Sequence, residues 1–158
     1  MRFYSASGFL AHVAQHGTKF SGSLDLRGCT GLTALPDNLS VSGSLDLPFC
    51  TGLTALPDNL SVSGSLYLQG CTGLTALPDN LSVGGSLDLQ YCTGLTAAIF
   101  NCGKSNRTIL PYNHPTKGRV ISLGCFIGTK DEAIKAVKEK YSGQDALDYI
   151  TKIELAFA

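Results

Sequence analysis

The sequence predicts a stacked-repeat solenoid. Leucines, cysteines and prolines recur with a period of 21 residues between Ser21 and Thr96. A fixed period of about 20 to 50 residues is the signature of stacked-repeat architectures. One such unit is too short to stand alone, because ordering its backbone costs about 1–2 kcal/mol per residue, so neighbouring units must share one core. The recurring positions are Leu24, Leu45, Leu66 and Leu87; Cys29, Cys50, Cys71 and Cys92; and Pro36, Pro57 and Pro78.

Residues 1–20 are predicted to form a helical cap. Ser7 is the expected N-cap and Gly17 the expected C-terminal stop. The expected apolar stripe of this helix is Phe9, Leu10, Val13 and Ala14. A solenoid exposes apolar surface at its ends, so a cap is needed there. His12 and His16 have the i, i+4 spacing of metal ligands, but without a third ligand nearby we interpret them as solvent-facing.

Four repeat units are predicted within residues 21–101. In each, the S-L-D-L segment alternates with period two, which predicts a short strand with its leucines inward. The C-T-G-L-T-A-L-P-D-N-L segment then returns on the other side, with Leu32, Leu35 and Leu39 inward. Because Pro36 and its equivalents cannot donate to a sheet ladder, the return side is predicted to be irregular or 3₁₀.

The unit L-D-L-x-x-C-T-G-L-T-x-L-P-D-N-L resembles a leucine-rich repeat. It is similar in particular to the short bacterial class with a Leu-Pro pair, as in secreted type III effectors. The resemblance implies a solenoid with a parallel β face. The first leucine of that pattern would fall near Ser21 and its equivalents, and the apolar residue is displaced to Val41, Val62 and Val83. A parallel β-helix is therefore an alternative fold.

Four of the six cysteines occupy one position of the repeat. Stacked strands lie about 4.8 Å apart, a separation that a disulfide accepts. The resemblance implies instead an inward residue that packs and hydrogen-bonds to the backbone, so a reduced ladder is favoured over partial disulfides or a metal. No Cys-x-x-Cys pair is present, and no histidine shares the register.

Sequence variation among the repeats is concentrated on one face. The segment T-G-L-T-A-L-P-D-N-L-S-V is identical in three complete copies, whereas the outward strand position and the two residues before each cysteine differ. Changes there introduced aromatic residues, which are typical anchors of binding surfaces. Tolerated drift is the alternative explanation. The candidate partner-binding residues are Asp25, Arg27, Asp46, Phe49, Tyr67, Gln69, Asp88, Gln90 and Tyr91.

Residues 102–158 are predicted to form a C-terminal α+β unit. The segments RTILPY and RVISLGCF flank the turn NHPTKG and indicate a loose hairpin. Thr129–Glu132 and Ser142–Asp145 are candidate capping boxes, each opening a helix. The end of the second helix could instead be a strand through Ile153, Leu155 and Phe157. The segment G-C-F-I-G-T-K-D-E-A is similar to C-terminal segments of phage and prophage repeat proteins, which implies a viral or mobile-element source.

The sequence offers little material for catalysis. Cys125 is flanked by apolar residues, which is typical of a buried thiol, and His114 lacks ligand spacing. Gly103-Lys104-Ser105 lacks the first glycine of a phosphate loop. Effectors with Leu-Pro repeats often carry a ubiquitin-ligase domain, but the C-terminal unit is too small for one. We therefore expect no catalytic residues, metal or cofactor, with a small enzyme centred on Cys125 or His114 as an alternative.

Composition narrows the class of partner. Lys and Arg together number 12, as do Asp and Glu, so the net charge of zero gives no footprint for direct nucleic-acid or membrane binding. The N-terminus makes a poor secretion signal. We expect a cytoplasmic, phage- or prophage-encoded module that binds a host protein, such as a nucleic-acid-binding defence factor of a CRISPR system. Self-association is a further alternative.

Overall fold

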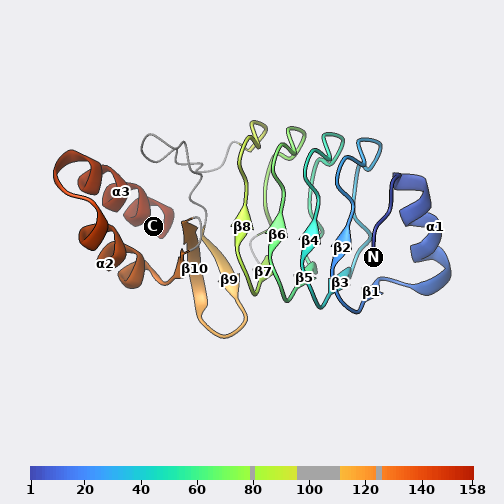
Figure 1. Cartoon of the computed structure of the whole chain (residues 1–158), viewed down its shortest axis with the longest axis horizontal. Helices are drawn as coiled ribbons and strands as arrows, with labels where there is room; N and C mark the ends of the chain where they lie inside the picture. The colour runs from blue at the N-terminus through green and yellow to red at the C-terminus, as the bar shows by residue number, and fades with distance from the viewer. Residues whose placement is uncertain (79–80, 96–110, 124–125) are drawn as a thin grey trace.

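The chain forms an elongated β-solenoid with a helix at one end and a small α+β unit at the other (Figure 1). The computed structural model describes residues 1–78, 81–95, 111–123 and 126–158. The predicted solenoid fold class is confirmed. The end of the repeats near Asn101 and the residues Cys102 and Cys125 lie outside the described residues.

One parallel ladder carries the predicted S-L-D-L strands. Its four strands are β2 (Leu24–Asp25), β4 (Leu45–Asp46), β6 (Leu66–Tyr67) and β8 (Leu87–Asp88), in this order. Leucine pairs with leucine along the whole ladder. The register therefore follows the 21-residue period, because a slip by one residue would turn every leucine outward.

A second parallel ladder runs along the return side of the solenoid. It consists of β1 (Lys19–Phe20), β3 (Ser40–Val41), β5 (Ser61–Val62) and β7 (Ser82–Val83). The return segment up to Leu39 is irregular, as predicted, apart from an isolated bridge between Ala34 and Ala55, but the short strands that follow it were not predicted. The displaced valines form the inner row of this ladder, since Val41, Val62 and Val83 are all buried.

The core lies between the two ladders. Leu24, Leu45 and Leu66 have no exposed surface, and Leu32, Leu35 and Leu39 are buried as predicted. The four repeat cysteines are free, buried thiols. Cys50 donates its S–H to the carbonyl of Leu26 in the preceding unit at 3.1 Å. Cys71 and Cys92 donate in the same way to the carbonyls of Leu47 and Leu68. The predicted reduced ladder with backbone hydrogen bonds is what the structure contains.

The N-terminal cap is α1 (Ala6–His16). Ser5, rather than the predicted Ser7, is the N-cap, because its side chain accepts the N–H of Gly8. Phe9 is buried, whereas Leu10 and Ala14 are exposed, so the predicted apolar stripe is narrower than expected. Because α1 sits on the solenoid end through one edge, only that edge needs to be apolar.

The two histidines of α1 are not simply solvent-facing. The rings of His12 and His16 stack with centroids 4.3 Å apart. His12 is half-buried, and its ring lies 5.2 Å from the ring of Phe3 and 5.7 Å from that of Phe20. His12 thus packs against the aromatic rings that lie between α1 and the first repeat.

The C-terminal unit begins with the predicted hairpin, extended by a third strand. The antiparallel strands are β9 (Pro111–His114), β10 (Gly118–Leu123) and β11 (Phe126–Gly128). The turn is shorter than predicted, because Asn113 and His114 belong to β9. Residues 107–110 of the predicted first strand lie outside the described residues.

Two helices, α2 (Lys130–Lys140) and α3 (Gly143–Ala156), complete this unit. The Thr129–Glu132 capping box is confirmed, because each side chain bonds the backbone N–H of the other residue. Ser142 makes no side-chain cap hydrogen bond, so the second predicted box is wrong. The final segment is helical, with Tyr149, Ile153 and Ala156 buried against α2, β10 and β11.

The C-terminal unit is joined to the solenoid along β7. Strand β9 pairs with β7 in parallel and continues the second ladder into a seven-stranded sheet. The Tyr112 hydroxyl donates to the Gly85 carbonyl at 2.7 Å. His114 Nδ1 accepts the Thr116 N–H at 3.2 Å, which leaves Nε2 as the donor to the Gly84 carbonyl at 2.8 Å. The unit therefore covers the open edge of β7.

Candidate functional site

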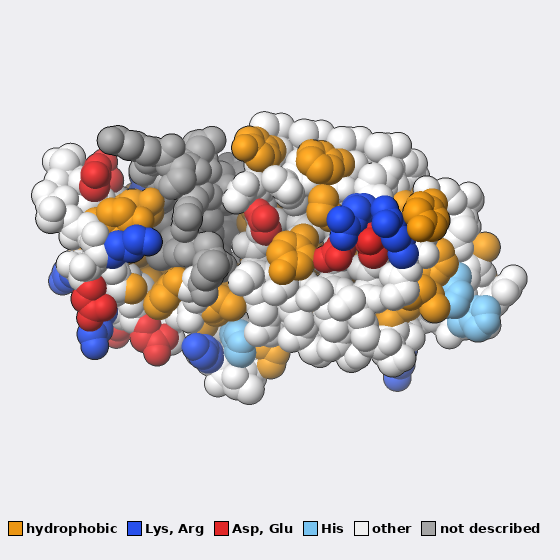
Figure 2. Space-filling view, viewed as in Figure 1, with side chains coloured by type: hydrophobic (Ala, Val, Ile, Leu, Met, Phe, Trp, Pro, Cys, Tyr) orange, Lys and Arg blue, Asp and Glu red, His pale blue; other side chains and the backbone are white. Residues whose placement is uncertain are grey.

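The predicted binding residues all lie on one side of the solenoid. They occupy the outward positions of β2, β4, β6 and β8 and the turns that follow these strands, which together we call the strand face. Figure 2 shows hydrophobic, acidic and basic side chains gathered over this part of the molecule, among surroundings that are mostly uncharged. Gln69 is half-buried, whereas Arg27, Gln90 and the three aromatic residues are exposed.

Each strand is followed by a tight turn with an unusual backbone. The N–H of Cys50 bonds the carbonyl of Leu47 at 3.2 Å and closes a four-residue turn, as does the equivalent bond in every other unit. The third residue of this turn has positive φ in all four units: Gly28, Phe49, Gly70 and Tyr91. Such a position takes glycine most readily, because a Cβ crowds the backbone there.

Two of these turn positions hold aromatic residues instead of glycine. Phe49 has φ 62° and Tyr91 has φ 60°, a conformation that costs a bulky residue about 1–3 kcal/mol. Phe49 and Tyr91 are 56% and 66% exposed, so burial of their rings offsets little of this cost. The Phe49 ring lies over Gly70, where an added Cβ would come within 2.6 Å of it. The two units with aromatic turns therefore alternate with two that have glycine.

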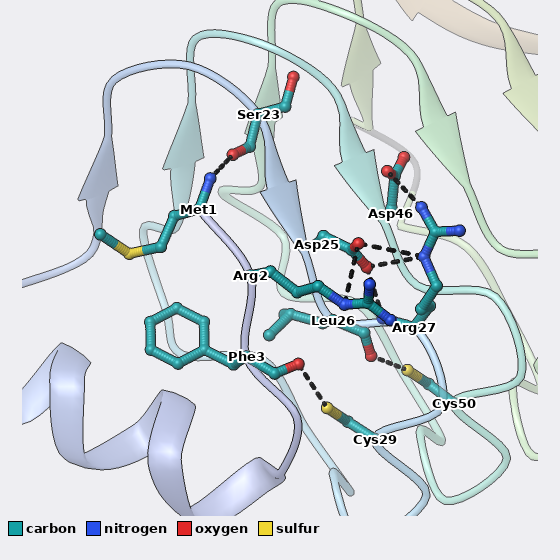
Figure 3. A network of polar contacts seen from close by, with 10 residues as sticks. All are labelled: Met1, Arg2, Phe3, Ser23, Asp25, Leu26, Arg27, Cys29, Asp46 and Cys50. Carbon is teal, nitrogen blue, oxygen red and sulfur yellow. Dashed lines mark hydrogen bonds and ion pairs between the residues drawn. The ribbon is translucent and has the colours of Figure 1, made fainter.

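The first two units carry an ionic network on the strand face (Figure 3). Nε of Arg27 reaches both carboxylate oxygens of Asp25, at 2.9 and 3.1 Å, and its Nη2 lies 3.4 Å from Asp46. Arg2 approaches Asp25 from the other side at 3.4 Å. Partial burial acts to raise the pKa of Asp25, but the hydrogen bonds and charge of Arg27 outweigh it, so this pKa lies below its usual value.

The fourth unit has the same carboxylate without an arginine. Asp88 accepts the backbone N–H of Gln90 at 3.0 Å, as Asp25 accepts that of Arg27 at 3.1 Å. Among the residues that the structure describes, no basic side chain forms an ion pair with Asp88. Its register partner on β6 is Tyr67, which is 37% exposed. The strand face is thus internally neutralised at its N-terminal end, whereas the carboxylate at its C-terminal end has no basic partner among the described residues.

Sequence reasoning missed the contribution of the N-terminus. Residues Met1 to Phe3 run beside β2, since Phe3 N–H bonds the carbonyl of Asp25 and Asp25 N–H bonds that of Met1. The guanidinium of Arg2 lies 4.8 Å from the centre of the Tyr4 ring, which is 82% exposed. No local signal reveals this isolated β-bridge between Arg2 and Asp25, because the two residues are more than 20 positions apart.

Of the two residues proposed for a small enzyme, Cys125 and His114, the structure describes only His114. Both ring nitrogens of His114 are engaged in hydrogen bonds, whereas Cys125 lies outside the described residues. Within the described ranges, no three His, Cys, Asp or Glu side chains meet in a metal-ligand cluster. None of the helices described has the length and apolar character that a membrane span requires.

Comparison of the chain with known proteins identified no relative. No protein-family model, curated protein or solved structure matches the chain.

Proposed function

We propose that this chain is a non-enzymatic protein-binding module whose strand face docks onto another protein. The observation that carries the proposal is the pair of exposed aromatic residues, Phe49 and Tyr91, at turn positions with positive φ. Gly28 and Gly70 occupy the same position without strain. Residues held in strained backbone conformations cluster at functional sites.

The composition of the face fits a protein partner. Exposed aromatic side chains are the commonest anchors of protein interfaces, and carboxylates beside them supply orientation and charge. Phe49, Tyr67 and Tyr91 share this face with Asp46 and Asp88. A partner with exposed basic residues, such as a nucleic-acid-binding protein, has the complementary charge.

A finer form of the proposal names the source and the target. The repeat resembles bacterial leucine-rich repeats, and residues 124–133 resemble a segment of phage and prophage repeat proteins. These resemblances support a phage- or prophage-encoded protein that acts in the bacterial cytoplasm on a host defence factor, such as a CRISPR nuclease. An interference assay in cells that express the chain tests this form, and unchanged interference would contradict it.

The docking proposal is tested by Tyr67→Ala. We expect this change to weaken binding of the partner, identified by affinity capture and then purified, by about 2 kcal/mol, roughly 30-fold in Kd. The melting temperature should stay nearly constant, because Tyr67 projects outward from β6. Asp58→Ala is the matched control, since Asp58 is exposed on the return side.

Equal affinity of Tyr67→Ala, Phe49→Ala and the parent would contradict docking through the strand face. The two alternatives have their own readouts. Light scattering after size exclusion separates a monomeric binder from a self-associating module. Cys125→Ser separates binding from catalysis, because a binding module keeps its full effect in that variant.

A further inference from the structure

Because the units repeat, the contacts of a residue in one unit indicate which contacts the equivalent residue in another unit can make. Asp25 and Asp88 occupy the same outward position, three units apart. Each accepts the backbone N–H of the residue two positions later, at 3.1 and 3.0 Å, so their carboxylates are held in the same way. What binds Asp25 therefore indicates what Asp88 can bind.

An arginine of the chain itself binds Asp25. Nε of Arg27 contacts both carboxylate oxygens, and Nη2 extends to the next unit. Planar guanidinium groups suit this arrangement better than an ammonium group does, because several N–H donors have a fixed geometry. In the fourth unit Gln90 stands where Arg27 stands in the first, and Asp88 has no cation among the described residues.

The surroundings of Asp88 favour an arginine further. Tyr67 is its register partner, and strands of a ladder lie about 4.8 Å apart. The exposed Tyr91 ring follows three residues later. Guanidinium groups are attracted to the faces of aromatic rings within about 6 Å. By contrast, Asp46 is already contacted by Arg27 and offers less to a partner.

We propose that the strand face takes an arginine side chain of its protein partner at Asp88, between Tyr67 and Tyr91. This inference rests on the proposed docking function and specifies its chemistry. The incoming guanidinium binds the Asp88 carboxylate as Arg27 binds that of Asp25. The N-terminal end of the face, where Arg2 and Arg27 already neutralise the carboxylates, takes no cation.

The test uses the peptide Ac-Gly-Arg-Gly-amide as the probe and follows backbone amide shifts by NMR. The matched control is Ac-Gly-citrulline-Gly-amide, in which a neutral urea replaces the guanidinium. We expect saturable shifts at Tyr67, Asp88 and Tyr91 with the arginine peptide, with a Kd in the millimolar range, and at least tenfold weaker binding of the citrulline peptide. Equal binding of both peptides, or shifts centred on Asp25, would overturn the proposal.

Two variants sharpen the test. Asp88→Asn should abolish the arginine-dependent shifts, and Gln90→Arg should do so by placing the chain's own guanidinium on Asp88. Asp58→Asn, on the return side, should change nothing. If either strand-face variant still binds the arginine peptide as the parent does, the assignment to Asp88 is wrong.

The arginine proposal and the docking proposal fail separately. Loss of partner binding in Tyr67→Ala, with full binding in Gln90→Arg and Asp88→Asn, would overturn the arginine site and leave docking intact. Arginine-peptide binding together with unchanged partner binding in Tyr67→Ala would support the site and contradict docking through this face.

Discussion

The two sides of the solenoid have the same period but hold their outward side chains differently. On the return side, each unit bonds the previous one through the same residue: Thr54 donates to the Thr33 carbonyl, Thr75 to that of Thr54, and Asn59 to the Asn38 side chain. On the strand face, the outward position holds aspartate in three units and Tyr67 in the other. Serines also bond from unit to unit beside the strand face, where the N–H of Ser44 bonds the Ser23 hydroxyl and later units repeat this bond. The outward strand position itself, however, is a row of unequal side chains.

This difference changes how variation among the repeats should be interpreted. The constancy of Asn38 and Asn59 has a structural cause, because each supports its neighbour. Variation on the strand face is therefore weak support for binding by itself. Backbone strain is stronger support, since Phe49 and Tyr91 occupy positions where glycine would cost less.

The largest expected effect comes from breaking the core that both sides share. Leu66 has no exposed surface and stacks between Leu45 and Leu87. Leu66→Ala should lower the free energy of unfolding by about 2–5 kcal/mol through lost burial and the cavity left behind. Denaturant unfolding followed by circular dichroism measures this change.

Leu147→Ala is the control for the core variant, because Leu147 is 57% exposed on α3. It should change the free energy of unfolding by less than about 0.5 kcal/mol. A similarly small loss for Leu66→Ala would contradict the stacked register.

An intermediate effect is expected from the cysteine ladder at alkaline pH. Burial raises the pKa of Cys50 to about 12, and those of Cys71 and Cys92 to about 11, from an ordinary value of 9.0. Below pH 9 the folded and unfolded states both keep these protons, so the stability is fully present. As pH rises from 9 toward 11, the unfolded state alone loses them, and the free energy of unfolding falls.

The expected loss is on the order of 1 kcal/mol per thiol and pH unit above 9. Urea titrations at several pH values measure it, and Cys71→Ala provides the comparison, because it should show a shallower fall. The difference in slope isolates one thiol from other groups that titrate in this range. Parallel pH profiles for parent and variant would mean that the ladder does not hold its protons as described.

The smallest expected change in the free energy of unfolding comes from the turns of the strand face, and it tests whether their positive φ is strained. Tyr91→Gly should raise the free energy of unfolding by about 0.5–1 kcal/mol, because glycine adopts positive φ freely. Gly28→Ala should lower it by about 1 kcal/mol. An added Cβ at Gly28 meets nothing within 4 Å, so this variant reports backbone strain without a clash.

Thermal and urea unfolding of the two turn variants give both values. If Tyr91→Gly stabilises the fold and also weakens partner binding, the strained residue is retained for function. Destabilisation by Tyr91→Gly would mean that the aromatic ring supports the fold, and the main argument for the strand face would be lost.

The 21-residue sequence period by itself determined the register of the leucine ladder, the row of buried cysteines and the outward position of Asp25, Asp46, Tyr67 and Asp88. Local chemistry determined the Thr129–Glu132 cap of α2. These features could be predicted because each depends on periodicity or on residues within one turn of a helix. The same logic placed the candidate residues on one face but did not reveal the geometry that distinguishes them.

Only the tertiary structure decided the remaining features. The valine ladder, the β-bridge between Arg2 and Asp25, and the pairing of β9 with β7 each need a partner distant in sequence. The positive φ at Phe49 and Tyr91 accompanies a hydrogen bond that closes each turn, and the Phe49 N–H also bonds the Gln69 carbonyl of the next unit at 2.7 Å. Arg27 neutralises Asp46 because stacking brings residues 19 apart to the same surface. These features could not be predicted from the sequence, because they depend on contacts between units that no single repeat contains.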